Sequence, residues 1–280
     1  MANSNDITDD PPPPYSSAAP TVVQLAQPQA QAQKQAPRTP GRFPAAFSMY
    51  RESGWGQRQY TLGEHQAAPL FAVALNAGRA GLRPGIVLHA GPSDAQPRLA
   101  TVESLGWEGR RGGGGGATVC FPSAHADGQS GVGRGAAESF EAAGGLGHKT
   151  YTFSIRTGVG AAARREPFEW RHSSGDAVRA LGGRGSGWKL CRLATEAPAG
   201  VAGGAFVLGG ERAGDGKEVV AVWAWSSGSL TKTLKFQFLG SGANGVLGER
   251  WALMAVMTAL KIWDIERRAR QSSGYAGAGA

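Results

Sequence analysis

The sequence predicts a mainly β protein in which roughly twelve antiparallel strands form a closed barrel that encloses one apolar C-terminal helix. Three observations lead to this fold. Short apolar runs follow one another from Phe47 to Leu239, separated by Gly, Pro, Asn and Asp. An unbroken apolar run then extends from Trp251 to Trp263. Glycine supplies 44 of the 280 residues without a Gly-X-Y period, which indicates many turns.

The strand predictions rest on alternating apolar and polar side chains. Tyr151, Phe153 and Ile155 alternate with polar residues, as a half-buried strand requires. The same pattern, together with turn signals, predicts strands near residues 46–51, 59–63, 69–76, 85–90, 97–104, 117–121, 150–157, 166–171, 177–181, 187–194, 217–226 and 230–239.

The run from Trp251 to Trp263 is rich in Ala, Leu and Met, which are strong helix formers. Its only polar residues are Thr258 and Lys261, so apolar side chains surround the predicted helix and we expect it to be enclosed. At about 1.5 Å per residue it is shorter than the hydrocarbon core of a bilayer, so we predict no transmembrane span. A wide closed barrel needs its interior filled, and this helix is predicted to fill it.

The predicted domain lies between two tails. Residues 1–42, rich in Pro, Gln and Ala, are predicted to be a disordered tail, because they offer too little apolar surface to offset the entropy of ordering. Residues 43–270 are predicted to form the barrel and its central helix, and residues 271–280 a second disordered tail. Two Gly-rich segments, about 109–116 and 123–148, are interpreted as loop insertions.

The N-terminus is acidic and polar, without the apolar core of a secretory signal. Cys120 and Cys191 are too few for a disulfide framework. We therefore expect a cytoplasmic or nuclear protein, able to associate peripherally with a membrane.

The order of elements over roughly residues 43–270 resembles the superfamily of the tubby C-terminal domain, the plant LURP-one-related proteins and the phospholipid scramblases. The segment 240–254, Gly-Ser-Gly-Ala-Asn-Gly-Val-Leu-Gly-Glu-Arg-Trp-Ala-Leu-Met, contributes to this resemblance. Segments 168–171, 187–190 and 217–223 also resemble an uncharacterised set of filamentous-fungal proteins. The resemblance implies a twelve-stranded barrel around a hydrophobic helix and a non-enzymatic module that binds phosphoinositide membranes or a protein partner. No motif matches tubby's lipid-binding positions, so no residue is carried over.

The stretch from Arg156 to Arg192 carries eight Lys or Arg and three acidic residues. Such a cluster favours an anionic lipid surface. The alternative is an ordinary solvated outer face of the sheet. Nucleic acid is disfavoured, because Trp170 and Trp188 are predicted to be core residues, not stacking platforms. The predicted lipid-binding residues are Arg164, Arg165, Arg171 and Arg179.

The N-terminal tail contains Pro12, Pro13 and Tyr15 in the order of a P-P-x-Y motif, the ligand of WW domains. An accessible motif of this kind recruits ubiquitin ligases in eukaryotes. The alternative function is therefore a ubiquitin-ligase adaptor or client that binds a WW-domain protein.

A third hypothesis is a nucleotide-binding enzyme that uses the loop from Gly240 to Gly245. The loop fits G-x-G-x-x-G, and Asp264 follows at about the spacing of a ribose-binding acid. No second strand is predicted after the helix, so this hypothesis ranks last. The histidines are scattered and no nucleophile motif occurs, so we predict no catalytic residue, no metal site and no cofactor.

Overall fold

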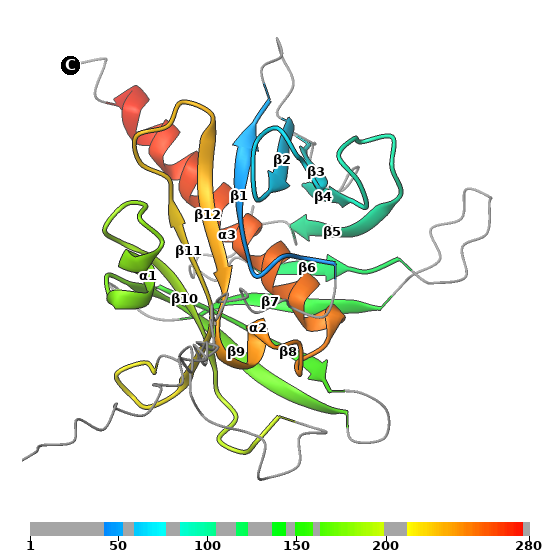
Figure 1. Cartoon of the computed structure of the whole chain (residues 1–280), viewed down its shortest axis with the longest axis vertical. Helices are drawn as coiled ribbons and strands as arrows, with labels where there is room; N and C mark the ends of the chain where they lie inside the picture. Colours follow the sequence, from blue (N-terminus) through cyan, green and yellow to red (C-terminus); the bar gives the residue numbers. More distant parts are fainter. Residues whose placement is uncertain are drawn as a thin grey trace, which may run out of the picture. The chain divides into compact units, whose positions relative to one another are not determined.

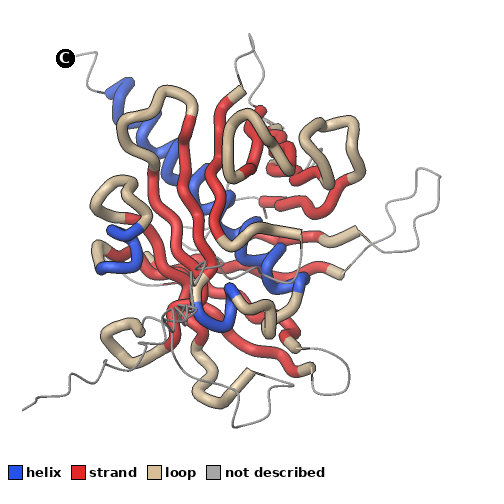
Figure 2. The backbone as a smooth tube through the Cα atoms, viewed as in Figure 1, coloured by secondary structure: helices blue, strands red, loops and turns tan. Residues whose placement is uncertain are grey.

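The computed structural model describes residues 42–52, 59–76, 85–104, 116–122, 136–143, 149–158, 163–198 and 212–276, with side chains as far as Ser272. Twelve antiparallel strands form a closed barrel (Figure 1), and the C-terminal helix α3 runs among them (Figure 2), which confirms the predicted fold. The strands are β1 (Ala46–Arg51), β2 (Gln59–Gly63), β3 (Phe71–Leu75), β4 (Ile86–His89), β5 (Arg98–Ser104), β6 (Ala117–Cys120), β7 (Ala137–Ala143), β8 (Thr150–Thr157), β9 (Arg164–Ser173), β10 (Gly187–Arg192), β11 (Glu218–Trp225) and β12 (Lys232–Phe238). The helices are α1 (Asp176–Ala180), α2 (Gly240–Ala243) and α3 (Glu249–Ala276).

Each strand pairs with its neighbours in sequence, and the barrel closes where β1 pairs with β12. At this seam Phe47 lies opposite Phe236, and their rings stack with centroids 4.8 Å apart. Closure removes the free strand edges that would otherwise invite pairing between molecules.

The helix α3 is enclosed by strands from all round the barrel. Trp251, near its start, packs against Phe168 of β9 and Phe238 of β12. Twelve residues further along, Trp263 contacts Tyr60 of β2 and Trp225 of β11. These contacts place the predicted segment of α3 in the core of the barrel.

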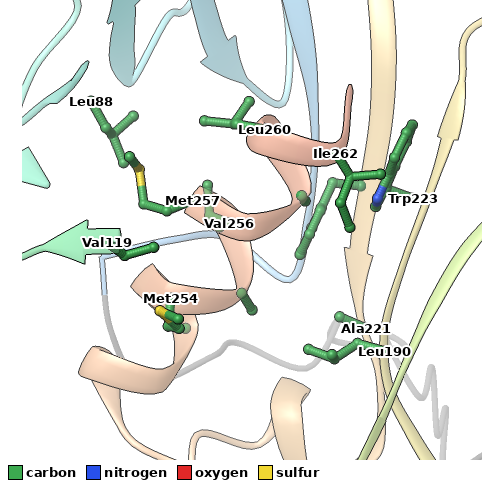
Figure 3. Packing of buried hydrophobic residues seen from close by; sticks show 14 of the residues in the cluster. Leu88, Val119, Leu190, Ala221, Trp223, Met254, Val256, Met257, Leu260 and Ile262 are labelled. Carbon is green, nitrogen blue, oxygen red and sulfur yellow. The ribbon is translucent and has the colours of Figure 1, made fainter. Parts of the chain in front are cut away.

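A closer view of this core shows how side chains of α3 reach different strands (Figure 3). Met257 points toward Leu88 of β4, and Ile262 points toward Trp223 of β11. Thr258 is the buried polar residue of this stretch, and its hydroxyl oxygen accepts a hydrogen bond from Trp170 Nε1 at 2.9 Å and donates to the Met254 carbonyl at 2.8 Å. The buried hydroxyl of Thr258 is therefore satisfied.

The strand predicted at 177–181 is wrong, because this segment forms the short helix α1. Ala177 and Val178 are both buried, so the apolar positions do not alternate as a strand requires. Val178 instead packs with Cys191 and Val222 in a second apolar cluster, which lies apart from the main core.

The loop insertion predicted at 123–148 is also wrong in part, because β7 lies within it. Glu138 and Phe140 are buried while Ala137, Ser139 and Glu141 are exposed, so the strand has the expected period of two. Its single large apolar residue and several small ones gave no clear strand pattern. The strand forms because β6 and β8 pair with it on either side.

The helix α3 is longer than predicted and continues to Ala276, into the predicted tail 271–280. The extension is supported by ion pairs one turn apart: Arg267 and Arg268 both pair with Asp264, and Arg270 lies near Glu266. The predicted tail 1–42, apart from Arg42, lies outside the described residues, as do 109–115, 123–135, 144–148 and 277–280.

Candidate functional site

The four arginines predicted to bind lipid do not gather at one place. Arg165 and Arg171 both lie on β9, where six residues of strand correspond to about 20 Å. Arg179 lies on α1, which packs against β10 and β11. The predicted patch is therefore divided between separate parts of the surface.

Arg171 and Arg179 are engaged by nearby groups of the protein. Arg171 donates to Glu169 at 2.6 Å and to Asp215 at 2.7 Å, and its hydrogen bond is the main reason that the pKa of Asp215 is lowered. Arg179 pairs with Asp176 and donates to a backbone carbonyl. Their positive charges are thus largely neutralised within the protein.

Arg165 belongs to a different arrangement, which we call the Glu138 cluster and define as Glu138, its partners Arg165 and Arg250, and Arg156, the cross-strand neighbour of Arg165. The Glu138 side chain is only 7% exposed and accepts hydrogen bonds from Arg165 and, at 2.8 Å, from Arg250. The two arginine side chains are 58% and 43% exposed. One buried carboxylate therefore anchors two guanidinium groups that keep donors directed at solvent.

Arg156 lies directly opposite Arg165 in the β8–β9 ladder, and both side chains are exposed. Arg156 makes no ion pair with any residue in the described part of the chain. Like charges at directly opposite positions repel and destabilise a sheet. The Glu138 cluster thus holds an uncompensated positive charge at the end of the barrel where α3 begins.

Arg164, the fourth predicted residue, is held next to this cluster by Glu166. Glu166 is 1% exposed and accepts from Arg164 at 2.8 Å and from the equally buried Arg192 at 2.6 and 2.9 Å. Burial alone would raise the pKa of Glu166, but the hydrogen bonds and charges of Arg192 and Arg164 outweigh it and lower that pKa. Arg164 also pairs with Glu196, so its role here is structural.

The loop from Gly240 to Gly245 is packed against the barrel wall. The backbone N–H of Ser241 donates to Glu218 Oε1 at 2.7 Å, and its hydroxyl donates to the same carboxylate. A Cβ atom on Gly242 would lie 2.3 Å from the Val220 carbonyl oxygen and 2.6 Å from the Trp251 ring. The glycines therefore allow close packing. The Glu218 carboxylate already binds the N–H and hydroxyl of Ser241, the donors that a bound phosphate would need.

The described part of the chain was also predicted to hold no metal site, no reactive thiol and no membrane-spanning helix. No group of three or more His, Cys, Asp or Glu side chains there is arranged to hold a metal ion. Burial raises the pKa of the Cys191 thiol to about 11, so it stays protonated at neutral pH. Among the described helices, none combines the length and the apolar character needed to cross a membrane. Pro12, Pro13 and Tyr15 lie outside the described residues.

Two members of the Glu138 cluster, Glu138 and Arg250, were not predicted from the sequence. Glu138 lay in a segment interpreted as a loop, and Arg250 lay at the start of a core helix. Arg156 belonged to the basic stretch, but only the β8–β9 register shows that it faces Arg165.

Comparison with known proteins identifies no relative: no family model matches the chain, and no curated protein or solved structure matches it either. The resemblance to the tubby, LURP-one-related and scramblase superfamily therefore stays a prediction.

Proposed function

We propose that the protein is a non-enzymatic binding module that recognises an anionic, phosphoinositide-containing membrane surface through the Glu138 cluster. The observation that carries this proposal is that Arg156, which forms no ion pair with the described residues, lies opposite Arg165. A phosphate group between the two would relieve their repulsion and accept charge-assisted hydrogen bonds from both.

The filled interior of the barrel favours recognition on its outside. Met257, Trp251 and Trp263 of α3 are at most 1% exposed and occupy the core. A headgroup therefore meets the outer surface and the ends of the barrel. At the end where α3 begins, the positive end of the helix dipole adds to the charge of the three arginines.

Co-sedimentation of the full chain with vesicles tests this proposal. We expect weak binding to neutral vesicles and binding that persists at physiological salt when a phosphoinositide is included. Arg156→Gln should weaken this binding about fivefold, because one basic residue near an anionic surface contributes about 1 kcal/mol. The double variant Arg156→Gln/Arg250→Gln should weaken it about twenty-fivefold.

The matched control is Arg184→Gln, which removes another exposed arginine near the opposite end of the β9–β10 ladder. It should bind as the parent does. Equal losses from Arg156→Gln and Arg184→Gln would mean that only net charge matters and would overturn the site. A soluble inositol phosphate added as a competitor separates headgroup recognition, which it blocks, from general attraction to the membrane.

A second function, the ubiquitin-ligase adaptor or client, is favoured by the P-P-x-Y motif of the tail. Tyr15→Ala is expected to abolish capture by an isolated WW domain, because the tyrosine fills the aromatic groove. Pro14→Ala changes the free position of the motif and should leave capture intact. Retention of Tyr15→Ala in the same pull-down would exclude the motif as the ligand.

A further inference from the structure

The end of the barrel where α3 emerges carries a second organised group of side chains, which we call the Glu266 site. Its members are Trp188, Trp225, Glu266 and Arg270. Trp188 Nε1 donates to Glu266 Oε1 at 2.7 Å, and Trp225 Nε1 donates to Glu266 Oε2 at 2.6 Å. Indoles from two neighbouring strands therefore fix both oxygens of one carboxylate on the helix.

The guanidinium of Arg270 occupies the Glu266 site in the way that a bound cation would. Its Cζ atom is 4.2 Å from the centroid of the Trp225 ring, and its Nη2 atom is 3.7 Å from Glu266 Oε2. An aromatic face beside a carboxylate attracts a guanidinium by both cation–π and ionic interactions.

The contact of Arg270 is loose enough to be exchanged. The 3.7 Å separation is too long for a hydrogen bond, whereas each carboxylate oxygen accepts one from an indole. The Arg270 side chain is 45% exposed and that of Glu266 is 24% exposed, so solvent reaches the pair. An exposed ion pair of this kind contributes at most about 1 kcal/mol, which an external cation can match.

The aromatic residues around Glu266 maintain the shape of the site. Burial first, and the charge of Glu266 second, raise the pKa of Tyr151 to about 12. His172 stands edge-on to Trp188, with ring centroids 5.6 Å apart. The carboxylate therefore faces a rigid aromatic wall on the barrel side and an exchangeable arginine on the solvent side.

We propose that the Glu266 site binds an arginine side chain of a partner peptide, and that Arg270 is the internal occupant which this arginine replaces. The position of Arg270 itself shows that a guanidinium fits over Trp225 beside the carboxylate. The site is independent of the membrane proposal, because sixteen residues of α3, or about 24 Å, separate Glu266 from Arg250.

The test follows the indole N–H signals of Trp188 and Trp225 by NMR in the full chain while N-acetyl-arginine amide is added. Arg270→Ala is expected to bind this probe saturably and about fivefold more tightly than the parent, because the internal competitor, worth about 1 kcal/mol, is gone. N-acetyl-citrulline amide, which has nearly the same shape without the charge, should cause no saturable shift.

Loss of the carboxylate should remove the binding. Glu266→Gln combined with Arg270→Ala is expected to abolish the response, followed on the signal of Trp188. Trp225→Leu combined with Arg270→Ala provides a second variant, should the first fail to fold. The proposal is overturned if Arg270→Ala and the parent respond alike, if the citrulline probe binds equally well, or if Arg270→Ala shows no saturable shift.

Discussion

Met257→Asp is expected to remove much of the protein's stability and to lower its melting temperature strongly. Met257 is 0% exposed and points from α3 toward Leu88 of β4 (Figure 3). An aspartate there would bury a carboxylate among apolar side chains, at a cost of at least about 4–5 kcal/mol. Ordinary domains are stable by about 5–15 kcal/mol, so this cost consumes much of the stability. Thermal unfolding followed by circular dichroism measures the effect.

Two controls separate the effect of burying a carboxylate from the effects of changing Met257 and of introducing an aspartate elsewhere. Met257→Leu keeps an apolar side chain of similar volume and should cost less than about 1.5 kcal/mol. Leu230→Asp makes an equally large change in polarity at a fully exposed position and should leave the melting temperature close to that of the parent. If Met257→Asp also melted like the parent, α3 would not be enclosed by the barrel.

Glu166→Gln is expected to destabilise the protein by about 3–5 kcal/mol, because it leaves the guanidinium of Arg192 buried without its counter-charge. Both side chains of this pair are 1% exposed, and two hydrogen bonds join them. Urea unfolding at neutral pH measures the change. The matched control is Asp176→Asn, which breaks the exposed pair with Arg179 and should cost at most about 1 kcal/mol.

The same carboxylate predicts how stability changes with pH. Because Arg192 and Arg164 lower the pKa of Glu166 in the folded protein, the group binds its proton more weakly there than in the unfolded chain. Its stabilising contribution is complete above the unfolded pKa of about 4.3 and is lost as the pH falls through the lower folded value. Glu166→Gln should lack this part of the acid-induced loss. An unchanged acid profile in the variant would mean that other carboxylates carry it.

The barrel and its helix were predictable because their patterns are local in the chain. Alternating residues such as Tyr151 and Phe153 report one buried face of a strand, and the apolar surface all round α3 reports its enclosure. The short strand β7 was not predictable in this way, since pairing with β6 and β8 decides its conformation. The helix α1 was missed because a segment of five residues is too short to show a helical period in the sequence.

The candidate site was less predictable. A sequence gives the number of charged residues, but it does not show which of them form ion pairs with residues distant in the chain. Arg171 is neutralised partly by Asp215, which the fold brings from 44 positions away. Arg250 and Glu138 meet across 112 positions. The number of basic residues in this stretch was therefore correct, but the sequence did not show which of them remain available to bind an anionic ligand.

The seam between β1 and β12 means that the barrel cannot close until β12 has been synthesised. Across it the Thr233 hydroxyl donates to the Met49 carbonyl, two positions separated by 184 residues. The helix that fills the lumen follows all twelve strands in the chain. On the ribosome, the nascent strands therefore present their inner apolar faces before α3, which packs against them in the folded barrel, has emerged. Such long-range closure is slow and leaves intermediates open to aggregation, so the nascent chain is a natural client for chaperones.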